Sequence, residues 1–424
     1  MSVLEFLPGG GTAQHDALGP VVDALRARGP WLAEVPVDTL LALFDDFAGR
    51  LMRDPRTQGI EGAMFLAAWL KRHNLENLLG LDLNGNPTYL DGFQPHGRDY
   101  LAAKPHGLVA MWMAGNVATL PMFSLVPGLL TKNACLVKLA QPEPQGIDHL
   151  LAVLAESGAE GLQGEELLEA AAVVWFDFRQ GELSEAMSRA ADAKVIWGGT
   201  SAIEAITRLP RPEHCVEIVF GPKYSIGVID RKRLEGDERA LDEAVAGFVR
   251  DVAIFDQRAC SAPQTIFVER NARWSLRQIA ERFGRHLERL GPKPGSDPYT
   301  TMQILEARAS WAMDESRDVM ASADGANWTV CLDREASLKE AVQSRTVFLT
   351  EVGSWRDVIP LLSPKVQTVG IAFAEREDAV ALAEAATRAG AVRCVRPGLM
   401  NNYESPWDGK LLVSQLVRWV TLKP

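Results

Sequence analysis

The feature that most constrains the fold is a regular alternation of short apolar strands with amphipathic helices over residues 107–206. GLVAMWMAG predicts a buried strand, residues 116–132 a helix, and ACLVKLA a second strand, which together form a βαβ unit. The alternation continues through AAVVWFDF and KVIWGG, each followed by a helical pattern. Strands that alternate with helices of this length predict a doubly wound α/β fold with a parallel sheet.

The same alternation begins again near residues 223–225 with SIGVID, a helix over 242–255 and the strand QTIFVE. TVFLTEV, VQTVGIAF and AVRCVRP predict further strands of this second region. Before the first strand, residues 16–87 show the three- and four-residue apolar spacing of helices. A chain of 424 residues exceeds one ordinary hydrophobic core. We therefore expect domains over residues 1–224 and 225–396, with a C-terminal segment over 397–424.

Charge and hydropathy exclude several function classes. The net charge is −11, and no block of lysine and arginine marks a nucleic-acid surface. The apolar stretch over 107–130 is interrupted by Asn116, Thr119 and two prolines, so it predicts a buried strand and helix rather than a membrane span. The start of the sequence has no basic region followed by an apolar run, which predicts no signal peptide and a cytoplasmic protein.

Metal-binding and disulfide patterns are also missing from the sequence. The five cysteines are scattered and include no CxxC pair, and the seven histidines show no HxxxH spacing. We therefore predict no metal and a reducing environment. The sequence also contains no GxSxG elbow and no Walker loop.

Cys260 is the candidate nucleophile. It lies in FDQRACSAPQ, after a predicted helix and before an apolar strand, where a loop emerges from a sheet. Arg258 and nearby backbone N–H groups would favour the thiolate, which is the reactive form. The alternative is that Cys260 is a small buried hydrophobe, as most free cysteines are. The other four cysteines lie in apolar strand or turn contexts that predict packing.

Several further segments occur in the order and spacing of a known family. They are GNVATLP (115–121), NACLVKLA (133–140), WGGTSAIEAI (197–206), FGPKYS (220–225), FDQRACSAPQ (255–264), VQTVG (366–370) and WDGKLL (407–412). Together they resemble the aldehyde dehydrogenase superfamily, and most closely its acyl-CoA reductases of the bacterial bioluminescence (LuxC-like) type. The resemblance extends from about residue 107 to the end and implies an aldehyde dehydrogenase-like fold.

The resemblance implies a role for two catalytic residues. Cys260 would form an acyl-enzyme, and the side-chain amide of Asn116, with the backbone N–H of the nucleophile, would bind the oxyanion of the adduct. The alternative for Asn116 is that it caps the following helix. Residues 1–224 would then be the nicotinamide dinucleotide-binding domain and 225–396 the catalytic domain, while 397–424 would return to the cofactor domain or form an oligomer interface.

The resemblance also implies cofactor-binding residues. Lys138 would bind the adenosine ribose, and Gly198, Gly199 and Thr200 would turn backbone N–H groups toward the pyrophosphate. Glu351 would hold the nicotinamide ribose. For Lys138 and Glu351 the alternative is a solvated residue at a strand end. Where strictly NAD-linked members often have a glutamate this chain has Gln141, and a neutral amide does not repel a 2′-phosphate. We therefore expect NADPH, with NADH as the alternative.

One departure from the superfamily pattern restricts the type of reaction that we expect. Hydrolytic members carry a water-activating glutamate where this chain has Val219, and the role is not transferred to Glu217. Without that base an acyl-enzyme exchanges with thiols rather than with water, so the resemblance implies reduction of an acyl-CoA or acyl-carrier-protein thioester to an aldehyde. The alternatives are a hydrolytic aldehyde dehydrogenase and a non-catalytic subunit of an acyl-processing complex. Superfamily members commonly assemble through an extended strand and the C-terminal segment, so the resemblance also implies a homodimer or homotetramer that uses the apolar LLVSQLVRWV.

Overall fold

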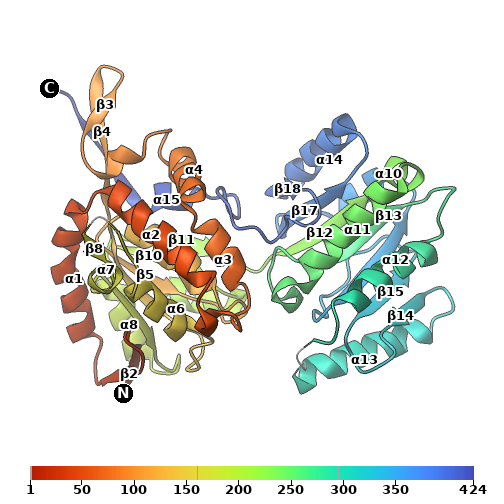
Figure 1. The fold of residues 1–424 in the computed structure, drawn as a ribbon, viewed down its shortest axis with the longest axis horizontal. Helices are drawn as coiled ribbons and strands as arrows, with labels where there is room; N and C mark the ends of the chain where they lie inside the picture. Colours follow the sequence, from red (N-terminus) through yellow and green to blue (C-terminus); the bar gives the residue numbers. More distant parts are fainter. Residues whose placement is uncertain (1, 160, 294–296) are drawn as a thin grey trace. The chain divides into compact units, whose positions relative to one another are not determined.

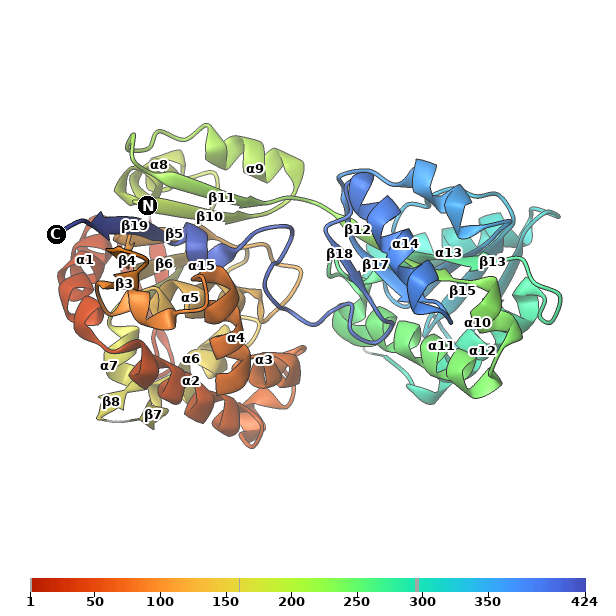
Figure 2. The ribbon, with the colours of Figure 1, turned by 90° about the horizontal axis from the view of Figure 1, so that it is seen from above.

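The computed structural model describes residues 2–159, 161–293 and 297–424, and it divides into two compact units (Figures 1 and 2). Unit 1 comprises the chain up to Gly221 together with Tyr403–Pro424, and unit 2 comprises Pro222–Asn402. Each unit contains its own sheet and its own buried apolar cores. We describe each unit by itself.

The sheet of unit 1 has the strand order β11-β10-β5-β6-β9-β1-β2. Its strands are β1 (Val3–Phe6), β2 (Thr12–His15), β5 (Leu108–Trp112), β6 (Ala134–Lys138), β9 (Ala171–Trp175), β10 (Ala193–Trp197) and β11 (Val216–Phe220). The five strands from β5 to β11 are parallel, and β5, the first of them in the chain, lies in the middle. The predicted doubly wound α/β class is confirmed. The antiparallel hairpin of β1 and β2 was not predicted, since the second strand, TAQH, is polar and largely exposed.

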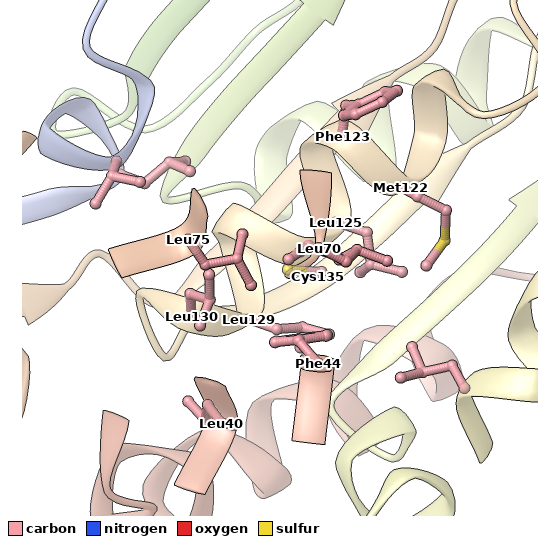
Figure 3. Packing of buried hydrophobic residues seen from close by; sticks show 14 of the residues in the cluster. Leu40, Phe44, Leu70, Leu75, Met122, Phe123, Leu125, Leu129, Leu130 and Cys135 are labelled. Carbon is pink, nitrogen blue, oxygen red and sulfur yellow. The ribbon is translucent and has the colours of Figure 1, made fainter. Parts of the chain in front are cut away.

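Helices surround this sheet. They are α1 (Gly19–Glu34), α2 (Val37–Leu51), α3 (Ala63–Trp69), α4 (Arg72–Asp82), α5 (Leu120–Leu130), α6 (Ile147–Ala155), α7 (Gly164–Leu168), α8 (Gly181–Ala190) and α9 (Thr200–Thr207), with short 3-10 turns at Pro55–Thr57 and Pro87–Leu90. Figure 3 shows Phe44 of α2 and Leu129 of α5 in one apolar cluster with Cys135 of β6. A Cβ at Gly128 would lie 2.5 Å from the Cys135 sulfur, so this glycine permits close packing of α5 on the strand.

The helix expected over residues 116–132 begins later, at Leu120. Pro121 stands in its first turn, where proline has no N–H to leave unpaired, and the residues before it form a turn. Thr119 occupies the N-cap position. Asn116 is therefore not the cap of this helix.

The C-terminal segment belongs to unit 1. It forms α15 (Leu412–Gln415) and β19 (Val417–Leu422), so the final apolar stretch is both helix and strand. The last strand pairs with β4 (Asp99–Pro105) in a three-stranded sheet of order β19-β4-β3, whose third member is Gln94–His96. A two-stranded hairpin, β7 (Gly158–Ala159) with β8 (Leu162–Gln163), completes the strands of the unit.

The sheet of unit 2 has the order β14-β15-β16-β13-β12-β17-β18, and its strands are parallel except for β14. They are β12 (Tyr224–Ile229), β13 (Pro263–Glu269), β14 (Asp318–Ala321), β15 (Thr329–Asp333), β16 (Thr346–Val352), β17 (Val366–Ala372) and β18 (Arg393–Val395). The helices are α10 (Arg231–Glu235), α11 (Glu238–Ala253), α12 (Leu276–Arg289), α13 (Pro298–Ala312) and α14 (Arg376–Arg388), with 3-10 turns η3 (Ile254–Gln257) and η4 (Trp355–Leu361). None of the helices in the described residues is long and apolar enough to cross a bilayer.

Candidate active site

The candidate residues of unit 1 gather at one edge of its sheet. Asn116 follows β5, Lys138 ends β6, and Gly198–Thr200 follow β10. These three strands are neighbours and run parallel, so their carboxyl ends share an edge. The chain leaves β5 for β6 on one side and later returns to β10 on the other, which makes the space between the β5 and β10 loops a topological switch point. Open α/β sheets bind their ligands at such points.

Lys138 is largely buried rather than solvated. Its side chain is 8% exposed, its Nζ donates to the carbonyl oxygen of Leu139 at 3.2 Å, and the same nitrogen lies 4.8 Å from the ring centre of Phe176. Burial lowers the pKa of Lys138 to about 8, against a smaller opposing effect of the Asp177 carboxylate. A desolvated ammonium at a strand end is well placed to attract an anionic or hydroxyl-bearing ligand.

Gln141 lies beside the loop that carries Asn116. A Cβ at Gly115 would come within 3.2 Å of the Gln141 amide nitrogen, so the two loops are in contact. Gln141 itself is exposed, and its side-chain oxygen accepts a hydrogen bond of 2.7 Å from the Gln145 side-chain amide nitrogen. A neutral amide thus stands at the sheet edge where the resemblance expects the adenosine ribose.

Gly198 and Gly199 join β10 to α9. Gly199 occupies the N-cap position in an extended conformation, and both Gly199 and Thr200 are exposed. The N–H of Gly198 donates to the carbonyl oxygen of Phe220 at 3.2 Å, which fixes the start of the turn. A glycine N-cap leaves the first N–H groups of the helix open to a phosphate. With Lys138 at the end of β6, two strands away along the same sheet edge, these residues fit a dinucleotide.

Cys260 lies in unit 2, in the turn between η3 and β13, and is half-buried. Three non-glycine residues before it, Phe255, Asp256 and Gln257, have φ values of +56°, +46° and +65°. A left-handed conformation costs about 1–2 kcal/mol for each such residue. Backbone strain of this kind persists only where surrounding contacts enforce it, and it concentrates at functional sites.

Gln257 supplies the first of these contacts. Its side chain is 1% exposed, and its amide nitrogen donates to the carbonyl oxygens of Pro263 and Thr346, each at 2.9 Å. Its side-chain oxygen accepts from the Thr346 N–H at 3.0 Å. One buried amide therefore joins the strained turn to the starts of β13 and β16. Sequence reasoning missed this residue, although a glutamine three positions before the candidate cysteine was visible.

A second left-handed turn, Gln343–Arg345, faces the first, with φ values of +67°, +55° and +56°. The Ser344 N–H donates to the Asp256 carbonyl oxygen at 3.0 Å, and the Ser344 hydroxyl donates to the Asp256 carboxylate at 2.8 Å. The Lys293 ammonium also contacts Ser344. Nothing in the sequence near Ser344 indicated this pairing, because it joins residues 88 positions apart.

The turn is also fixed on the side of Cys260 itself. Its carbonyl oxygen accepts a hydrogen bond of 2.7 Å from the Ser225 hydroxyl, whose oxygen accepts from the Thr368 N–H at 3.1 Å. The neighbouring Ser261 hydroxyl donates to the Asn401 side-chain oxygen at 2.8 Å. The backbone on both sides of the thiol is therefore fixed by buried polar groups.

The other cysteines lie in packing environments. Burial raises the pKa of all four thiols, to about 12 for Cys331 and about 11 for Cys394. A thiol with a raised pKa is a poor nucleophile near neutral pH. This agrees with the packing roles predicted for them.

The sequence of this chain is similar to a known family and to several reductases. A family model described as acyl-CoA reductase (LuxC) matches residues 32–419 of the chain. The chain therefore belongs to the acyl-CoA reductase (LuxC) family. Two relatives are the long-chain acyl-protein thioester reductases of Aliivibrio fischeri and Vibrio harveyi, which are 24% and 26% identical to it. These matches cover 82% and 80% of this chain and 70% and 68% of the relatives.

Solved structures similar to this LuxC-family chain are aldehyde dehydrogenases. The enzyme from Brucella melitensis biovar abortus 2308 matches with a TM-score of 0.71 at 12% identity, over 100% of this chain and 93% of that one. Aldehyde dehydrogenase C from Pseudomonas syringae, crystallised with NAD+ and octanal, matches with a TM-score of 0.67 at 11% identity, over 99% and 93%. The expected aldehyde dehydrogenase-like fold is confirmed.

In this LuxC-family chain, Val219 lies half-buried in β11, and the nearest acid on that strand is engaged elsewhere. The Glu217 carboxylate is 3.2 Å from the buried Lys194 ammonium and 3.3 Å from the Arg211 guanidinium. Both cations therefore already pair with this carboxylate. Glu217 is therefore poorly suited to activate water.

Glu351 is not brought to the cysteine. It lies near the carboxyl end of β16 and pairs in register with Val268 of β13, whereas Cys260 precedes the amino end of β13 at Pro263. Five residues of strand separate the two positions, roughly 16 Å at 3.3 Å per residue. The Glu351 carboxylate instead pairs with the exposed Arg270 at 3.2 Å. Glu351 is therefore poorly placed to hold a nicotinamide ribose beside the candidate thiol.

No group of three or more metal-binding side chains occurs among the described residues.

Proposed function

We propose that this chain reduces an acyl thioester to an aldehyde through an acyl-enzyme on Cys260. The observation that carries the proposal is the strained turn before Cys260, which buried contacts of Gln257 and Ser344 hold in place. Membership of a reductase family and the aldehyde dehydrogenase fold support the same chemistry. The names of the relatives support a protein-bound thioester as donor, with acyl-CoA as the alternative that presents the same reacting group.

In the proposed mechanism the Cys260 thiolate attacks the thioester carbonyl and forms a tetrahedral adduct. The Asn116 amide and the Cys260 backbone N–H are the proposed hydrogen-bond donors to the developing oxyanion. The adduct collapses when the bond to the donor sulfur breaks, and the departing thiolate takes a proton from water. A reduced nicotinamide, when bound, supplies the hydride that reduces the acyl-enzyme. Breaking the bond to Cys260 then releases the aldehyde and restores the thiolate.

Unit 1 is proposed to hold the nicotinamide cofactor. The fit rests on Lys138, on the N–H groups that begin at Gly198–Thr200, and on the switch point between β5 and β10. The neutral Gln141 supports NADPH over NADH, because a carboxylate there would repel the 2′-phosphate. A Gln141→Glu variant should lose about tenfold in affinity for NADPH and little for NADH, measured by fluorescence titration. Equal losses for the two cofactors would contradict the assignment.

The proposed reaction is tested by capturing its intermediate. The full chain is incubated with a mass-resolved acyl-CoA without nicotinamide, digested, and analysed by peptide mass spectrometry. We expect the acyl mass on Cys260, its loss after NADPH is added, and no label in a Cys260→Ser variant. An acyl group on any other residue, or no acyl group at all, would overturn the proposal.

We also propose that the chain forms a homo-oligomer. Strand β19 is an edge of the three-stranded sheet, and its Leu422 is 43% exposed. Exposed edge strands pair readily with other chains. Sedimentation of the purified protein would test this, and a monomer at micromolar concentration would contradict it.

A further inference from the structure

Unit 2 has a further feature that is typical of a ligand-binding site. It lies at the carboxyl edge of the sheet, opposite the edge where Cys260 lies. The chain leaves β12 for β13 on one side, whereas β17 and β18 lie on the other side of β12 (Figure 1). The carboxyl ends of β12 and β17 therefore form a topological switch point, the place where doubly wound sheets bind ligands. The thiol precedes β13 at the opposite, amino edge, so this switch point lies at the edge of the unit 2 sheet away from Cys260.

A cavity of about 290 Å³ lies at this edge, between α11, the end of β17 and the segment after β18. Three arginines line it, Arg233, Arg250 and Arg396, against a single acid, Glu243. The Glu243 carboxylate already pairs with the Arg239 guanidinium at 3.0 Å, on the exposed surface of α11. The cavity therefore has an excess of positive charge.

The Arg233 guanidinium uses only part of its hydrogen-bonding capacity within the described residues. One of its terminal nitrogens donates to the carbonyl oxygen of Phe373 at 2.7 Å, which fixes the side chain. Its Nε is shielded from solvent and has no hydrogen-bond partner among the described residues. Buried donors without partners are uncommon in folded proteins and often mark a missing ion or water.

The wall formed by the segment after β18 is rigid. The Asp251 carboxylate accepts the N–H groups of Gly398 and Met400 at 2.5 and 3.1 Å. A Cβ at Gly247 would lie 2.7 Å from the Pro397 backbone, so α11 packs directly on this segment. The Arg250 guanidinium lies against Gly398, 3.2 Å from where a Cβ would stand. A site with fixed walls loses little entropy when a ligand binds.

We propose that this cavity, the arginine pocket, binds the phosphate group of a small phosphate ester. Planar guanidinium groups recognise phosphate oxygens in pairs, and several of them together favour a doubly charged phosphate over a singly charged carboxylate. Phe373, Ile371 and Leu399 supply an apolar wall for the remainder of the ester. All the residues that line the pocket belong to unit 2.

The test is isothermal titration calorimetry on the full chain at constant ionic strength, with inorganic phosphate, phenyl phosphate and benzoate as probes. We expect one saturable site, with phenyl phosphate tighter than inorganic phosphate and benzoate at least about tenfold weaker than phenyl phosphate. An Arg250→Gln/Arg396→Gln double variant should lose about tenfold or more in phenyl phosphate affinity. Cys260→Ser should bind as the wild type does, which separates this site from the proposed reaction.

The matched control is Arg388→Gln on α14, whose side chain is 77% exposed and pairs only loosely with Glu384. It removes one positive charge from the same unit and should leave binding unchanged. Binding that survives the double variant, or that Arg388→Gln weakens equally, would overturn the proposal, because the phosphate would then bind elsewhere or through net charge alone. Equal binding of benzoate would overturn the assignment to phosphate.

Discussion

Unit 1 carries its candidate residues at the carboxyl ends of strands β5, β6 and β10 or on the loops that follow them, whereas Cys260 of unit 2 comes before strand β13. At the carboxyl edge of the first sheet the strand direction alone brings Asn116, Lys138 and Gly199 to one place, with no strained backbone at these residues. At the amino edge of the second sheet the turn before Cys260 needs three left-handed residues and a buried amide to hold it. The side chains of a functional site can thus be positioned at a sheet edge in two ways. Either the sheet topology alone brings them together, or local contacts hold the backbone in an unfavourable conformation.

The largest expected effect falls on the thiol at the strained edge. Cys260→Ala should lower kcat for aldehyde formation by at least about 10³-fold, because the covalent route is lost. Cys394→Ala is the matched control, since Cys394 is also a half-buried thiol of unit 2 and should retain nearly full activity. Activity is followed by cofactor absorbance, and folding by circular dichroism. Comparable losses in both variants would mean that Cys260 has no special role.

The next effect falls on the contacts that enforce the turn. Gln257→Ala removes three buried hydrogen bonds and leaves the Pro263 and Thr346 backbone groups unpaired, which should lower the free energy of unfolding by about 3 kcal/mol. Urea denaturation measures this, and the rate of Cys260 alkylation should change with it. Gln303→Ala on α13, whose side chain makes one long surface contact, should cost less than about 0.5 kcal/mol. A Gln257→Ala protein as stable as the wild type would show that the turn is held by other means.

The same contrast explains what the sequence could predict. Strand periodicity was enough to predict that Asn116, Lys138 and Gly198–Thr200 stand at strand ends, because periodicity is local and the rule that parallel strand ends meet is general, whereas the roles of these residues came only from the family resemblance. The support of Cys260 depends on Thr346 and Ser344, which are more than eighty positions away, and on backbone angles that phenylalanine and glutamine rarely adopt. Periodicity carries no information on either.

The proposed role of Lys138 at the carboxyl edge of the first sheet predicts that cofactor affinity depends on pH. Burial lowers its pKa to about 8, so the side chain is charged below that pH and becomes neutral above it. If the charge attracts NADPH, the cofactor dissociation constant should rise by up to about tenfold between pH 7 and pH 9. A bound anion favours the charged form and moves the inflection upward. Lys138→Met should bind more weakly at pH 7 and lose most of the pH dependence, and an unchanged pH profile in that variant would remove Lys138 from the cofactor site.

The smallest effect is expected at Glu351, and it tests whether the two edges of the second sheet are functionally separate. Glu351 lies at the edge opposite Cys260 and pairs with the exposed Arg270, an ion pair that contributes little to stability. Glu351→Gln should therefore change KM for the cofactor and kcat by less than about twofold. A nicotinamide ribose held by this carboxylate would instead raise KM for the cofactor about tenfold or more. That result would mean that the cofactor binds at the carboxyl edge of the second sheet. It would contradict the conclusion that the two edges of this sheet have separate functions.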